Sequence, residues 1–83
     1  MPVLDEAYES IFNQVLEHGL YVISVSMTQE GYFEKESDFI DSLTHPTKGI
    51  LQFLEREDRF EDCALLMKMI KKVKENRKYL WHE

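Results

Sequence analysis

Apolar side chains recur at intervals of three or four residues along most of the chain, which is the spacing of a helix with one buried face. The first such segment begins near Leu4, and three acidic residues follow in its first turns, where the helix dipole favours negative charge. Its apolar stripe consists of Tyr8, Ile11, Phe12 and Val15. The pattern predicts one long helix over residues about 4–27.

Residues 20–27 (LYVISVSM) fit two conformations. Their β-branched residues could form a strand with alternate side chains on one face, namely Tyr21, Ile23, Val25 and Met27. A helix is the other interpretation, with Gly19 and Ser26 as small residues that let another helix approach closely. A lone strand would have no partner elsewhere in the chain, so we favour the helix and keep the strand as the alternative.

Polar residues and Gly31 indicate a connector over residues 28–45. Within it, Ser37 has the side chain of a helix N-cap, which predicts a short helix over residues 38–43. Pro46 fits the first turn of a further helix, expected to end near Arg56. The apolar residues that this helix should bury are Ile50, Leu51, Phe53 and Leu54.

The last part of the chain, residues about 46–79, predicts an antiparallel helical hairpin with a tight turn at Glu57 and Asp58. Asp58 and Glu61 have the spacing of a capping box that would start the second helix. With only three glycines and two prolines, the chain has few helix breakers. We therefore expect a single all-α domain of three main helices and a short connector helix.

The centre of this hairpin has an aromatic–Glu pair, two small residues and two apolar residues at four-residue spacing. This order resembles the UVR motif of the excision-nuclease subunits B and C and of some stress-protease adaptors. The matching residues are Phe60, Glu61, Cys63, Ala64, Leu66 and Ile70. The resemblance covers about a quarter of the chain and departs from the family at Met67-Lys68, where Arg-Asp is usual. It implies a hairpin that docks on a second helical partner, often a copy of itself, and has no chemistry of its own.

The sizes of these side chains explain why their order favours a helical hairpin. Phe60 would plug its end, while Cys63 and Ala64 would let the two helices approach each other closely. Leu66 and Ile70 would continue the apolar contact between them.

Composition and charge narrow the class of protein. The chain has 83 residues, one cysteine and a net charge of −6, so it has the size of one small domain and no internal disulfide. No apolar run is long enough for a membrane span and the N-terminus has no basic signal region, so we expect a soluble, cytoplasmic protein. Residues 1–66 carry a net charge of −10 and residues 67–83 a net charge of +4.

Residues suited to catalysis or metal binding do not gather in a recognisable pattern. His18, His45 and His82 are far apart in the sequence and lack neighbouring ligands at metal-binding spacing. Cys63 follows Asp62, whose carboxylate disfavours a thiolate, and no glycine-rich phosphate loop is present. We expect no enzyme activity, no cofactor and no metal site.

The last helix is apolar on two sides. Its main stripe is Cys63, Leu66, Met67, Ile70 and Val73, with Trp81 in line. Leu65 and Met69 project to a different side of the helix, so this helix either lies in the middle of the domain or covers a partner. The expected contact residues are Leu65, Met69, Tyr79 and Trp81, with Lys72 and Lys74 steering an acidic partner.

These observations predict a non-enzymatic protein–protein interaction module, an adaptor or small regulator that binds another protein or a second copy of itself through helix-on-helix contacts. A homodimer is one such form, and direct binding of nucleic acid or membrane is not expected. The alternative is an acidic inhibitor encoded by a phage or mobile element. Its carboxylates would imitate nucleic acid and bind an enzyme that handles it.

Overall fold

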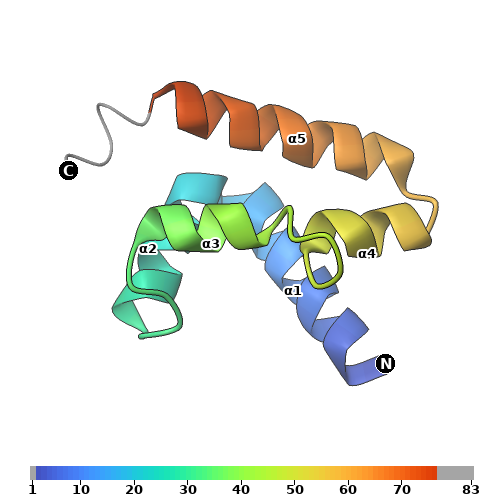
Figure 1. Cartoon of the computed structure of the whole chain (residues 1–83), viewed down its shortest axis with the longest axis horizontal. Coiled ribbons are helices and arrows are strands. Elements are labelled where there is room, and N and C mark those ends of the chain that lie inside the picture. The colour runs from blue at the N-terminus through green and yellow to red at the C-terminus, as the bar shows by residue number, and fades with distance from the viewer. Residues whose placement is uncertain (1, 77–83) are drawn as a thin grey trace.

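The computed structural model describes residues 2–76 of the chain, and these residues form five helices and no strand (Figure 1). The helices are α1 (Pro2–His18), α2 (Leu20–Gln29), α3 (Glu36–Ser42), α4 (Ile50–Arg56) and α5 (Phe60–Glu75). The all-α class expected from the sequence is confirmed, and residues 20–27 are helical. None of the described helices is long and apolar enough to cross a membrane.

The helices surround a single apolar core to which all five contribute. In Figure 1, α5 lies along one side of the molecule, while α1 and α2 diverge beneath it. α5 packs against α4 and α2, α3 packs against α2, and α1 contacts both α2 and α4. The most deeply buried apolar side chains are Phe12, Val15, Ile40, Leu43, Leu54 and Leu66.

Gly19 divides the expected long helix into α1 and α2, so the prediction of one continuous helix over residues 4–27 is wrong. Its dihedral angles are φ 96° and ψ 149°, a region that essentially only glycine adopts. Val15 and Leu20 are both buried, although five residues would separate them by about 140° around a straight helix. The bend thus turns both side chains into one core. A Cβ at Gly19 would meet no heavy atom within 4 Å, so close helix approach is not its purpose.

The helix that was expected to start at Pro46 starts instead at Ile50. The preceding residues form a turn in which Nδ1 of His45 accepts hydrogen bonds from the backbone N–H groups of Thr47 and Lys48, each at 3.2 Å. Gly49 closes the turn so tightly that a Cβ there would lie 2.5 Å from the carbonyl oxygen of Leu43.

Two predicted caps also differ from the structure. The N-cap residue of α3 is Lys35, and Ser37 is a buried residue inside the helix. The capping box does not form, because Asp58 has a left-handed backbone (φ 57°) and Arg59 is the N-cap residue of α5 without a side-chain cap. An aspartate tolerates this conformation better than most residues do, and it lets the chain reverse within residues 57–59.

The bend at Gly19 gives a first prediction. Replacing Gly19 by alanine should lower the free energy of unfolding by about 1–3 kcal/mol, because a Cβ is strained at these dihedral angles. Urea unfolding followed by circular dichroism would measure the change. The exposed Gln29→Ala substitution on α2 is the control and should stay within about 0.5 kcal/mol of the wild type. Equal stability of the two variants would contradict the strain argument.

Candidate functional site

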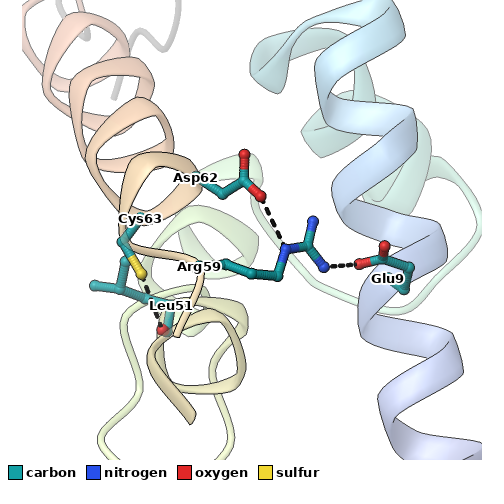
Figure 2. Close-up of polar contacts among 5 residues, drawn as sticks. All are labelled: Glu9, Leu51, Arg59, Asp62 and Cys63. Carbon is teal, nitrogen blue, oxygen red and sulfur yellow. Dashed lines mark hydrogen bonds and ion pairs between the residues drawn. The ribbon is translucent and has the colours of Figure 1, made fainter. Parts of the chain in front are cut away.

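Arg59 fixes the beginning of α5 against α1. Its guanidinium donates hydrogen bonds to the carboxylate of Glu9 through Nη1 and, over 2.8 Å, to Oδ2 of Asp62 through Nε (Figure 2). The guanidinium also lies 5.4 Å from the ring centroid of Phe12 and 6.0 Å from that of Phe53. Hydrogen bonds to Glu9 and then to Asp62 raise the pKa of Arg59. These contacts hold α1, α4 and the first turn of α5 together.

Cys63 joins α5 to α4 one helical turn after Arg59. Its thiol donates to the backbone carbonyl of Leu51, with 3.9 Å between sulfur and oxygen (Figure 2). Burial raises the pKa of the Cys63 thiol, and the carboxylates of Glu55 and Asp62 raise it further. Burial and the neighbouring carboxylates therefore both disfavour the thiolate form of Cys63.

α5 exposes large apolar side chains on both edges of its buried face. Leu66 and Ile70 are buried, as expected from the sequence, whereas Phe60 is 63% exposed and Met67 is 52% exposed. Phe60 and Met67 are seven residues apart, which places them on the same edge of the helix. Leu65, 42% exposed, lies on the other edge.

Lysines follow these apolar residues in the second half of α5, where Lys68, Lys71, Lys72 and Lys74 are all exposed. Lys74 pairs with Asp41 of α3 over 3.5 Å, and both side chains are largely open to water. A hollow of about 560 Å³ lies beside Met67, and its lining includes Ile70, Lys71 and Lys74. Met67, Lys71 and Lys74 therefore share one surface, which Glu75 also borders.

The predicted contact residues fall into three groups. Leu65 and Lys72 are exposed on one edge of α5, and Lys74 lies on the other edge. Met69 is half-buried and packs against the core, so it contributes to the stability of the fold as well as to any contact with a partner. Tyr79 and Trp81 lie outside the described residues.

Phe60 and Met67 were assigned to the interior and are exposed instead. Phe60 does not plug the end of the hairpin, because its side chain is exposed, whereas Phe53 is buried and its ring centroid lies 6.0 Å from the guanidinium of Arg59. Met67 lies beside the buried stripe, about 70° around the helix from the centre of Cys63, Leu66 and Ile70. The seven-residue spacing of Phe60 and Met67 places both on one edge of the helix, but spacing alone does not distinguish an exposed edge from a buried one.

A second, larger hollow of about 680 Å³ lies between α1, the end of α2 and α3. Its lining is mostly apolar and includes Ile11, Phe33 and Phe39, with the charged residues Glu30 and Lys48. Within residues 2–76, no group of three or more His, Cys, Asp or Glu side chains is placed to hold a metal ion. Comparisons with protein-family models, curated proteins and solved structures found no match to the chain.

The Arg59 contacts give a second prediction. Arg59→Met should cost about 1–2 kcal/mol of unfolding free energy, because two charge-assisted hydrogen bonds are lost from a partly exposed site. A double-mutant cycle with Glu9→Gln should give a coupling energy of about 0.5–1 kcal/mol. Arg56→Met is the control: its ion pair with Asp5 spans 3.5 Å and is more exposed, so the loss should stay below about 0.5 kcal/mol. Additive effects of the Arg59 and Glu9 substitutions would refute the direct contact.

The buried thiol gives a third prediction. At pH 8 the native protein should react with a disulfide reagent at least about tenfold more slowly than the urea-unfolded chain, because Cys63 reacts only after local opening. The raised pKa adds a pH effect, since the folded state holds the thiol proton more tightly. The resulting stabilisation of the folded state is complete below the ordinary thiol pKa of 9.0 and is lost as the pH rises through the folded-state pKa.

Comparing unfolding free energies of the wild type and of Cys63→Ala from pH 7 to pH 10.5 isolates the thiol from other titrating groups. The stability advantage of the wild type should shrink above about pH 9. A constant difference, or equal labelling of the native and unfolded protein, would show that Cys63 is accessible.

Proposed function

We propose that this protein is a non-enzymatic protein–protein interaction module, an adaptor or small regulator whose contact surface is the exposed part of α5. The observation that carries the proposal is the exposure of Phe60 and Met67 next to a group of lysines on a helix whose other face is fixed in the core. Aromatic side chains and methionine are enriched in protein interfaces, and methionine adapts to differently shaped partners.

The anchoring of α5 supports this proposal. Arg59 and Cys63 hold its first turns, and Leu66 and Ile70 hold its middle. A helix that is already ordered loses little conformational entropy when a partner covers its outer face. The exposed side chains of α5 can therefore contribute more of their contact energy to binding.

The lysines give the contact surface a chemical preference. The first 66 residues carry a net charge of −10, yet α5 ends with four exposed lysines within seven residues. Lys68, Lys71 and Lys72 form no ion pair within the part of the chain that the structure describes. They suit a partner surface with carboxylates beside an apolar patch.

Affinity capture tests this function with a tagged wild type and the Met67→Glu variant, each exposed to a nuclease-treated lysate of the source cells. We expect the wild type to retain one protein in stoichiometric amount, a different chain or its own untagged copy, and Met67→Glu to retain at least about tenfold less. Leu16→Glu is the matched control, because Leu16 is similarly exposed on α1 and lies outside the surface.

Two results would contradict the proposal. One is that no chain is retained in stoichiometric amount. The other is that Met67→Glu and Leu16→Glu retain the same amount of the bound chain. If neither substitution changes the affinity of the complex, and the affinity falls steeply with rising salt, the binding is through surface carboxylates, as in an acidic inhibitor.

A further inference from the structure

The exposed edge of α5 has the spacing of a coiled-coil seam. Phe60, Ala64, Met67, Lys71 and Lys74 are separated by four, three, four and three residues, and all five are exposed. This alternation is the heptad spacing with which one helix packs lengthwise along another. The buried residues Cys63, Leu66 and Ile70 lie on a different face, so the apolar seam residues Phe60 and Met67 stay exposed, while Lys74 also pairs with Asp41 of α3.

Charge changes sign along this edge. Glu61 lies in the first turn of α5, while lysines begin at Lys68 and continue to the end of the helix. Glu61 directly follows the seam residue Phe60, and Lys68 directly follows the seam residue Met67, so the two occupy equivalent flanking positions one heptad apart. A helix that is acidic at one end and basic at the other complements a copy of itself that runs in the opposite direction.

We propose that α5 pairs with α5 of a second copy in an antiparallel, two-fold symmetric dimer. This proposal rests on the proposed function and specifies its partner. The two-fold axis passes midway between Ala64 and Met67. In this register, Ala64 packs against the partner's Met67, and Phe60 packs against the aliphatic stem of the partner's Lys71. Glu61 then faces the partner's Lys68, and the symmetry repeats each contact.

A single register satisfies all of these contacts, which is why we assign the surface to a second copy. The small side chain of Ala64 allows close approach near the axis, where Met67 fills the remaining space. A parallel pairing in register would set Lys71 and Lys74 against the same lysines of the partner, and like charges in contact are unfavourable. The antiparallel pairing also places the positive end of each helix dipole beside the negative end of the other.

The size of the contact limits its strength. One helix pair of this length buries an area at the low end of specific interfaces, so we expect a dissociation constant of about 1–100 μM. The dimer should form in a concentration range that sedimentation equilibrium covers directly.

The experiment compares charge-reversed variants of the full-length chain by sedimentation equilibrium between 1 and 500 μM. One variant is Glu61→Lys, and the other carries Lys68→Glu and Lys71→Glu; all three side chains are exposed and form no ion pair among the described residues. Each variant alone should dimerise at least about tenfold more weakly than the wild type. An equimolar mixture should regain wild-type affinity or better, because the reversed charges are complementary across the two-fold axis.

Lys35→Glu combined with Lys48→Glu is the control for net charge, since it makes the same change in charge as the double lysine variant at two exposed positions outside α5 and should leave dimerisation within about threefold. Circular dichroism confirms that each variant is folded. A wild type that stays monomeric at 500 μM overturns the proposed dimer, as does a mixture that fails to regain affinity. If the monomer still captures another protein and Met67→Glu prevents this, the proposed function stands and only the assignment of a second copy as the partner is wrong.

Discussion

The position of α5 depends on one guanidinium. Arg59 lies where α1, α4 and α5 meet, and it binds two carboxylates while it rests near the rings of Phe12 and Phe53. The turn before it has no side-chain cap, so the direction of α5 is set by these contacts and by the buried face that follows. Because the guanidinium is 29% exposed, water weakens each pair, but the planar group satisfies both carboxylates and both rings in a single orientation.

Short helices make the rest of the fold dependent on its turns. α3 and α4 have seven residues each and would not be stable alone in water. They are held by burial of Phe39, Ile40, Phe53 and Leu54 and by turns that bring those side chains inward. Two glycines act here for different reasons: Gly19 supplies a backbone conformation, and Gly49 leaves room for a carbonyl group. The backbone geometry of these turns therefore determines how the small core is closed.

The sequence was sufficient to predict the helical class and the inward positions of Leu66 and Ile70, because both follow from periodicity. Periodicity could not predict the break at Gly19, since the apolar stripe continues past it and only the shared core requires the bend. The capping box failed for a similar reason: Asp58 has the right spacing but adopts a left-handed backbone. Arg59 was missed because its partner Glu9 lies fifty residues earlier. Phe60 was expected inside because it opens the hairpin pattern, but its side chain is exposed.

The order in which the helices pack has a kinetic consequence. α1 packs on α2, α2 on α3, and α4 on α5, so much of the core forms between neighbours in the chain. Short loops close at little entropic cost, and helical domains of low contact order fold within microseconds to milliseconds. The long-range Glu9–Arg59 pair joins the first and last of these helices, so closing it costs more chain entropy than the local pairs do. Fast local pairing of this kind shortens the time for which apolar surfaces are open to aggregation.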